Sequence, residues 1–182
     1  RCDFTIPLAR FYSTNSYENE EARYCYFGKV YRKEMMHKGR SSEFFQGGVE
    51  LINKAGIAGD KECLNMIQES LPHLGLSNIL IELGSAAFFN RLCTLNSLLL
   101  TLPTAFGSLE SLESIIANID DEILQEAMQH LKELYNSLDN QQSIIFDLGM
   151  VPTMKYYTGL MIKGYSDKCA QPIISGGRYD DL

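Results

Sequence analysis

Two polar side chains and a glycine alternate along one predicted strand in a pattern that could hold a small ligand. Gln46, Gly48 and Glu50 are each two residues apart, so in a β-strand all three point to the same face. Glycine lets a ligand approach the backbone, a carboxylate accepts hydrogen bonds from a cationic nitrogen, and an amide both donates and accepts. The pattern suits a small zwitterionic ligand. It equally fits an ordinary sheet with two solvated polar residues and a glycine at a bulge.

A second group of charged residues lies just upstream. Arg32 and Glu34 are two apart at the end of a predicted strand, and Arg40 follows in a polar loop over residues 35–42. The guanidinium fork matches phosphate or carboxylate well, although an Arg-x-Glu pair is also typical of surface ion pairs. The group gains weight from its context, a strand followed by a polar loop and then by the strand that carries Gln46, Gly48 and Glu50. Loops longer than a tight turn are more often functional.

The strands that must position these residues are indicated by composition. Residues 22–33 and 43–52 are rich in aromatic and apolar side chains, which predicts two strands joined by the polar loop. Further strands are predicted over residues 79–83, 144–146, 158–165 and 172–174. Together they predict a mostly antiparallel sheet.

Helices are predicted between the strands. Asp60 is placed to cap a helix with apolar residues at helical spacing that ends by Pro72 and Gly75. From about residue 92 to 140 the pattern is helical only, and its clearest helix follows Asp120-Asp121-Glu122. The apolar stripe of that helix contains Ile123, Leu124, Ala127, Met128, Leu131, Leu134, Tyr135 and Leu138. The fold class is therefore α+β, with core segments 1–91 and 143–182 and a helical insertion over 92–142.

Composition limits the function. The chain of 182 residues is 45% hydrophobic and has a formal net charge of -7, so it has apolar surface for one substantial core and no concentrated basic surface for nucleic acid. The five cysteines lie far apart without a CxxC pair, which favours reduced thiols, each a small core residue, over disulfides or zinc. No apolar run approaches the roughly 20 residues of a membrane span, and a cytoplasmic location is expected. Both ends of the chain read as interrupted motifs, as in a fragment.

The motifs resemble those of a known family. Tyr31 to Glu34, the loop through Gly39-Arg40 and residues 43–50 resemble motif 2 of class II aminoacyl-tRNA synthetases in its histidyl-specific form. Residues 1–5 with Arg10 resemble the strand-to-helix segment before that motif. Residues 156–159 and 175–180 resemble the two histidine-specific segments after the insertion. The resemblance frames nearly the whole chain and implies a class II aminoacyl-tRNA synthetase-like antiparallel sheet flanked by helices, with a helical insertion.

Several positions depart from the synthetase pattern. Synthetases carry a substrate-contacting arginine and a Gly-Leu-Asp run before the tandem tyrosines, whereas residues 152–155 here read Pro-Thr-Met-Lys. Ser42 stands where a second loop arginine is usual, and Thr158-Gly159 replaces Asn-Arg. No other side chain in the 152–155 run restores a guanidinium fork. The departures favour a catalytically silent branch of the family, the regulatory subunits of short-form ATP phosphoribosyltransferases.

The residues that surround bound histidine in the synthetases are largely matched. By resemblance, Asp3, Thr5 and Gln46 would hold the ammonium end of histidine, while Glu50 and Tyr157 would face its imidazole. A relict pocket that no longer binds histidine is the alternative. Arg32, Glu34 and Arg40 would be relicts of a nucleotide site. No catalytic residue, metal or cofactor is expected.

The resemblance implies a partner and a ligand. The partner is the short-form ATP phosphoribosyltransferase catalytic subunit, in a hetero-oligomer within which this protein also self-associates, and histidine is the effector that gives feedback inhibition. The assembly catalyses the first step of histidine biosynthesis. Neither a membrane nor tRNA is expected as a partner. Two alternatives stay open: a histidyl-tRNA synthetase catalytic-domain fragment, and a synthetase-like domain embedded in a larger signalling protein.

Overall fold

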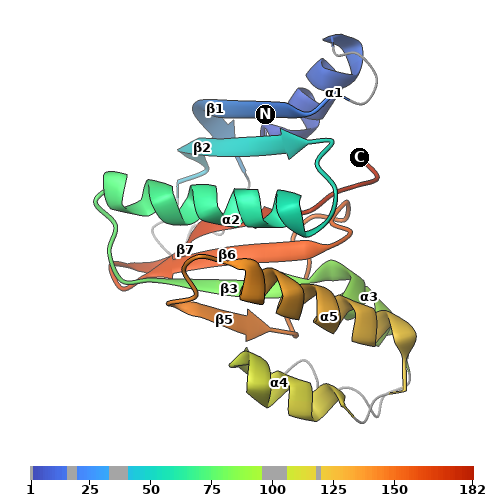
Figure 1. Ribbon diagram of the computed structural model, residues 1–182. Coiled ribbons are helices and arrows are strands. Elements are labelled where there is room, and N and C mark those ends of the chain that lie inside the picture. The colour runs from blue at the N-terminus through green and yellow to red at the C-terminus, as the bar shows by residue number, and fades with distance from the viewer. Residues whose placement is uncertain (1, 16–19, 33–40, 96–105, 118–119) are drawn as a thin grey trace. The chain divides into compact units, whose positions relative to one another are not determined.

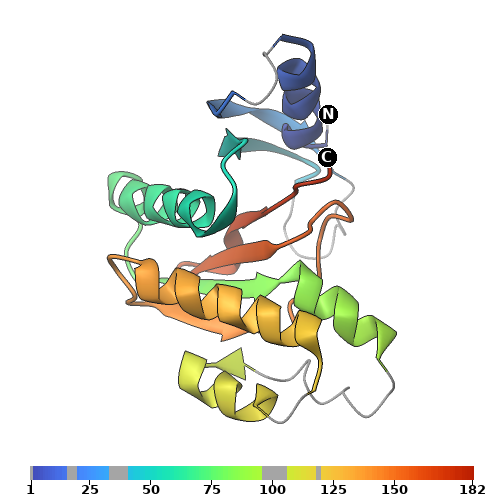
Figure 2. The same cartoon turned by 45° about the vertical axis from the view of Figure 1, so that its right-hand side comes forward.

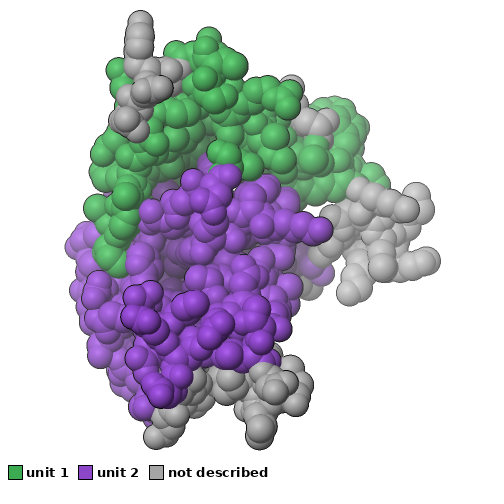
Figure 3. All heavy atoms as spheres, turned by 90° about the vertical axis from the view of Figure 1, so that its right-hand side faces the viewer, with its two compact units in different colours: residues 1–59, 182 green, residues 60–181 purple. Residues whose placement is uncertain are grey.

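The computed structural model describes residues 2–15, 20–32, 41–95, 106–117 and 120–182. The chain divides into two compact units, one of residues 1–59 with 182 and one of residues 60–181 (Figure 3). Each unit has its own sheet. The predicted Glu34 and Arg40 lie outside the described residues.

The first unit is a helix packed on a two-stranded hairpin. Helix α1 spans Thr5–Asn15, and strands β1 (Ala22–Tyr31) and β2 (Glu43–Ile52) pair antiparallel. Phe11 of α1 meets the ring of Tyr24 edge-on with 6.0 Å between ring centroids. This aromatic contact holds α1 on the face of the hairpin to which Tyr24 points, above β1 in Figure 1.

The opposite face of the hairpin is aromatic and exposed. Phe27 of β1 and Phe45 of β2 stack with ring centroids 5.2 Å apart, and the two are 76% and 60% exposed. Lys29 and Glu43 form an ion pair of 2.5 Å on the same face. The alternation of exposed and covered residues confirms the two predicted strands and their facing.

The second unit is built on a mixed five-stranded sheet in the order β4-β5-β3-β6-β7. The strands are β3 Ile79–Ser85, β4 Phe106–Gly107, β5 Ile144–Asp147, β6 Leu160–Ser166 and β7 Cys169–Gly177. Three neighbouring pairs are antiparallel, and β3 with β5 is parallel. The α+β class and the mostly antiparallel pairing are confirmed. Strand β4 shows that the region from 92 to 140 is not helical only, because Phe106 and Gly107 pair with β5.

Helices cover the sheet of the second unit. The helices are α2 Gly56–His73, which starts at the end of the first unit, α3 Ala86–Thr94, α4 Leu109–Ile116 and α5 Glu122–Ser137. Helices α3 and α5 lie against each other and against β3 (Figures 1 and 2). Asp121 caps α5 by accepting from the Leu124 amide at 3.1 Å. The predicted apolar stripe of α5 is buried except at Tyr135, which is half-buried, and at its start, where Ile123 is 45% exposed.

Helix α2 ends where the sequence predicts. The amide of Leu76 donates to the carbonyl of Leu71 and that of Gly75 to Pro72, which with the positive φ of Gly75 is a Schellman C-terminus. Its start differs from the prediction, because the helix begins at Gly56 and Asp60 lies inside it. The Asp60 side chain is instead buried against residues of α5 and of the chain after β7.

The cysteines are free thiols, as predicted, but they are not core residues. Cys2, Cys25, Cys93 and Cys169 are exposed and Cys63 is half-buried. Cys25 shows the reason, since it alternates with the covered Tyr24 and Tyr26 and must point outward. None of the described helices is both long and apolar enough to cross a membrane.

Candidate functional site

The ligand-type face predicted on β2 is formed as expected. Gln46, Gly48 and Glu50 occupy the covered side of the strand, and Glu50 is only 8% exposed. Phe45 and Val49 point to the exposed side. The face therefore carries a buried carboxylate and a half-buried amide on either side of a glycine.

The glycine is not an open floor, however. Tyr26 lies directly opposite Gly48 in the hairpin register, and a Cβ added at Gly48 would collide with the ring and hydroxyl of Tyr26. Tyr26 in turn stacks on Phe4, with ring centroids 4.6 Å apart. A Cβ at Gly28 would come within 2.8 Å of the Phe4 ring. The two glycines thus leave room for a pair of aromatic rings, and the prediction that a ligand could approach the backbone at Gly48 is wrong, because Tyr26 fills that space.

The segment that leads into α1 and the first residue of that helix bring two more predicted residues to this face. Asp3 is 5% exposed, and the hydroxyl of Thr5 donates to Glu50 Oε1 at 2.7 Å. Asp3, Thr5, Gln46 and Glu50, together with Tyr26, are called the inner cluster below. Four of the five predicted histidine-site residues therefore belong to one covered group of the first unit.

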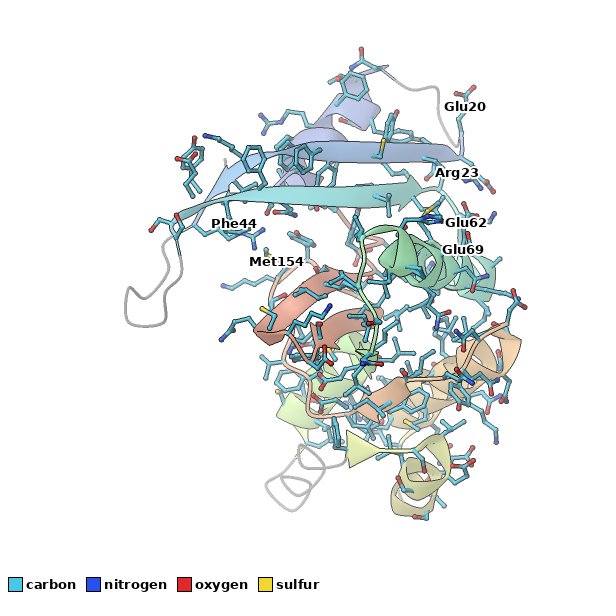
Figure 4. All side chains as sticks on the ribbon, turned by 90° about the vertical axis from the view of Figure 1, so that its left-hand side faces the viewer. Glu20, Arg23, Phe44, Glu62, Glu69 and Met154 are labelled. Atoms are coloured by element: carbon cyan, nitrogen blue, oxygen red, sulfur yellow. The ribbon has the colours of Figure 1, made fainter. Side chains whose placement is uncertain are left out.

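Arg32 is joined to the inner cluster through Gln46. Its Nη2 donates to Gln46 Oε1 at 2.8 Å, and Gln46 Nε2 donates to the Tyr26 hydroxyl at 3.2 Å. Arg32 Nε also donates to the carbonyl of Cys2 at 2.7 Å, and its guanidinium lies 5.3 Å from the ring centroid of Phe44, labelled on β2 in Figure 4. These contacts fix the arginine from several sides.

The electrostatics of the inner cluster favour a cationic ligand group. Burial raises the pKa of the Tyr26 hydroxyl above its ordinary value, and the charges of Glu50 and Asp3 add to the effect, while Gln46 and Arg32 oppose it. Tyr26 therefore keeps its proton near neutral pH. Two buried carboxylates, a hydroxyl and an amide can together accept the hydrogen bonds of an ammonium or imidazolium group.

The fifth predicted residue, Tyr157, lies in the second unit. Its ring packs on Gly177, where a Cβ would come within 3.0 Å of three ring atoms, and against a small apolar cluster of Ala86, Met150 and Met161. Tyr156 meets it edge-on at 5.3 Å. The two histidine-specific segments of the resemblance are thus packed on each other through Tyr157 and Gly177.

A polar network that the sequence analysis missed holds the second of these segments. Arg178 donates to Asp180 Oδ2 at 2.8 Å and to Asp60 Oδ1 at 3.2 Å. The other Asp60 oxygen is 2.6 Å from His130 Nε2 on α5. Thr158 donates to Asp180 at 3.2 Å. The neighbouring guanidinium lowers the pKa of Asp180. Only the fold brings α2, α5 and the end of β7 together, so sequence spacing gave no signal for this network.

The segment with the departures from the synthetase pattern lies between β5 and β6. Pro152 is half-buried and Lys155 is exposed, and residues 151–159 contain no helix or strand. Met154, labelled in Figure 4, belongs to the same segment. Lys155 provides an ammonium group, and proline provides no hydrogen-bond donor at all. Within the described residues, no group of three or more His, Cys, Asp and Glu side chains is placed to hold a metal ion.

Comparison with known sequences identifies a family. The chain matches the family described as histidyl-tRNA synthetase over residues 1–98 and 93–182. It is 40% identical over 214 residues to an ATP phosphoribosyltransferase regulatory subunit of Lactococcus lactis subsp. lactis, covering all of this chain and 65% of that protein. The chain therefore spans somewhat less than two thirds of this relative.

Solved structures give the same fold. A protein described as an ATP phosphoribosyltransferase regulatory subunit/histidyl-tRNA synthetase from Bacillus halodurans superposes with a TM-score of 0.82 at 27% identity, over 99% of this chain and 57% of that one. A histidine-tRNA ligase subunit from Alicyclobacillus acidocaldarius gives a TM-score of 0.77 at 20% identity, over 99% and 68% of the two chains. At that identity the second likeness concerns the fold alone. The predicted class II synthetase-like fold is confirmed.

Proposed function

This chain belongs to the histidyl-tRNA synthetase family, and from its likeness to a relative named as a regulatory subunit we propose that the protein is a non-catalytic regulatory subunit of an ATP phosphoribosyltransferase that binds free histidine. In this proposal residues 1–91 and 143–182 are the two parts of the synthetase-like core, and residues 92–142 are its helical insertion. The protein would work in the cytoplasm, in the first step of histidine biosynthesis.

One observation carries the proposal: the inner cluster is assembled while the activating segment is altered. Asp3, Thr5, Gln46 and Glu50 are grouped on one covered face, whereas Pro152 and Lys155 stand, by the resemblance, where the synthetases carry an arginine and an aspartate. Such a protein can still bind histidine at its amino-acid site. Without the arginine guanidinium it loses the charge stabilisation that the transition state of histidine adenylation needs. The 40% identical relative with the regulatory-subunit name supports this assignment over a synthetase.

The proposed partner is a short-form ATP phosphoribosyltransferase catalytic subunit, in a hetero-oligomer in which this protein also self-associates. Histidine bound at the inner cluster would act as the feedback effector. Coupling between two binding sites is reciprocal, so the substrates of the catalytic subunit would weaken histidine binding by the same factor. No tRNA takes part.

Reconstitution tests the proposal. The full-length protein is mixed with its cognate catalytic subunit, the mass of the assembly is measured by light scattering after size exclusion, and phosphoribosyl-ATP formation is followed. A stable hetero-oligomer is expected, with activity that neither protein has alone. A catalytic subunit that is fully active alone and elutes separately would show that the assignment is wrong.

Aminoacylation provides the opposing test. Loss of one preorganised donor costs a rate factor on the order of a hundred or more, so the full-length protein is expected to show no histidine-dependent exchange of pyrophosphate into ATP and no charging of tRNA. A known histidyl-tRNA synthetase serves as positive control. Exchange at the rate of that control would favour the synthetase alternative.

A further inference from the structure

Arg32 donates to two neutral acceptors that come from different segments of the first unit. Nε binds the Cys2 carbonyl at 2.7 Å, just before α1, and Nη2 binds Gln46 Oε1 at 2.8 Å, on β2. The guanidinium also lies over the Phe44 ring. Because the guanidinium is planar and its donors are fixed in one fork, these contacts set the distance between the two segments.

The first consequence concerns the direction of the Gln46 amide. Arginine has donors and no acceptor, so the amide must present its oxygen to Arg32 and its NH₂ to Tyr26. The Tyr26 hydroxyl then accepts from Gln46, and its own proton is available to donate. Without Arg32 the amide could turn over, and the donor and acceptor positions along this side of the inner cluster would be exchanged.

The second consequence concerns Asp3 and Thr5. The carbonyl of Cys2 is covalently adjacent to Asp3, which is buried, and two residues further on Thr5 donates to Glu50. Tethering Cys2 therefore fixes the backbone that carries two residues of the inner cluster. Displacing a polar group of a binding site by even about 1 Å is enough to lose much of its contribution.

We infer that Arg32 is a positioning residue of the amino-acid site, which holds the Asp3 segment against β2 and sets the orientation of Gln46. This inference rests on the proposed function, because it takes the inner cluster as the histidine site. It assigns a present role in amino-acid binding to a residue that the family resemblance places in a nucleotide site.

Calorimetric titration with L-histidine tests the role, using the full-length protein in complex with its catalytic subunit. Arg32→Lys keeps the charge but lacks the planar fork that spans both acceptors, and Arg32→Met removes both donors. Both variants are expected to bind histidine about tenfold more weakly or worse, the loss typical of a charge-assisted hydrogen bond. The matched control is Arg23→Met, which removes an arginine on β1 that pairs with Glu21 at 3.2 Å, and its affinity should stay within about twofold of wild type.

A double-mutant cycle with Gln46→Met distinguishes positioning from general destabilisation. If Arg32 acts partly through Gln46, the losses from Arg32→Lys and Gln46→Met are not additive, whereas independent effects would add. Thermal unfolding of each variant shows whether it is folded, and Arg32→Lys remains informative if Arg32→Met does not fold.

Three results would overturn the inference. One is additive losses in the cycle, and another is a histidine affinity that Arg32→Lys leaves unchanged. The third is a wild-type complex that forms and is active but binds no histidine, which would leave the proposed partnership with the transferase standing and remove histidine binding from the proposal. A parallel titration with ATP addresses the nucleotide role: loss of ATP binding in Arg32→Lys with histidine affinity intact would assign Arg32 to a nucleotide instead.

Discussion

The inner cluster of the first unit and the polar network around Asp60 in the second unit both contain carboxylates and lie beside an arginine, but their arginines bind different kinds of group. The second group, Asp60, His130, Thr158, Arg178 and Asp180, is called the Asp60 network below. In the second unit Arg178 is bound directly to the carboxylates of Asp60 and Asp180. In the first unit Arg32 donates to a neutral amide and a neutral carbonyl, and Glu50 accepts from the neutral hydroxyl of Thr5. Ion pairs between segments hold those segments together, whereas the carboxylate, hydroxyl and amide groups of the inner cluster can bind the polar groups of a ligand.

This comparison predicts where a substitution affects folding and where it affects binding. Changes in the Asp60 network should reduce stability, because they remove one member of a partly buried ion pair. Changes in the charges of the inner cluster should mainly alter ligand affinity. The predictions below are ordered from the largest expected effect to the smallest.

Asp60→Ala should give the largest loss of stability. The side chain is 7% exposed and binds both Arg178 and His130, so its removal is expected to cost about 3 kcal/mol, at the low end for broken buried pairs. Asp139→Ala is the matched control, since Asp139 pairs with Lys61 but is 79% exposed, and it should cost less than about 1 kcal/mol. Urea unfolding measures both. Equal costs would show that the Asp60 network is not the structural element described here.

Glu50→Gln should weaken histidine binding by about 2 kcal/mol, because it removes the charge but keeps an oxygen that can accept from Thr5. Stability should change little. Calorimetry on the complex measures the affinity. Glu43→Gln, on the exposed side of the same strand and paired with Lys29, is the control and should bind as wild type does. If wild type and Glu50→Gln bind equally, the inner cluster is a relict.

Gly48→Ala should destabilise the first unit by about 1 kcal/mol or more, because its Cβ would collide with Tyr26 and displace the ring from its packed position. The Cβ added by the neighbouring Gly47→Ala would lie 3.4 Å from the Phe27 side chain and 3.7 Å from the Tyr26 carbonyl oxygen, both ordinary contact distances, so this substitution should be close to neutral. Thermal unfolding of the pair is the measurement. Similar losses at both positions would mean that Tyr26 does not depend on the glycine opposite it.

The smallest effect concerns acid stability. Arg178 holds the pKa of Asp180 below its ordinary value of 3.8, so the ionised form stabilises the fold above about pH 4, and this contribution is lost as the pH falls through the lowered pKa. Asp180 is more than half exposed, so the contribution should stay below about 0.5 kcal/mol after screening. The difference in unfolding free energy between wild type and Asp180→Asn should shrink from about pH 5 to about pH 3. A difference independent of pH would contradict the pairing.

The sequence predicted much of the fold because its signals are local. The alternation around Gln46 and Glu50 predicted which side chains of β2 share a face. The acidic residues at the start of α5 and its apolar stripe predicted that helix. The stripe failed at Ile123, which lies in the first turn. Strand β4 was missed because a strand of two residues carries no periodicity.

The other features that the sequence could not predict are non-local. Tyr26 fills the space over Gly48 because the hairpin register places them opposite each other, and composition alone does not give the register. Asp60, the predicted N-cap, lies about one turn inside the observed helix, and its partners are 70 and 118 residues away. The grouping of Asp3 and Thr5 with β2 was available only through the family resemblance.

Histidine inhibition of the reconstituted transferase tests the central claim most directly. The formation of phosphoribosyl-ATP is measured against histidine concentration, with this protein as wild type or Glu50→Gln and with the same catalytic subunit. We expect equal activity without histidine, and an inhibition curve shifted at least about tenfold to higher histidine in the variant. Superimposable inhibition curves would contradict the claim that the inner cluster is the site at which histidine acts.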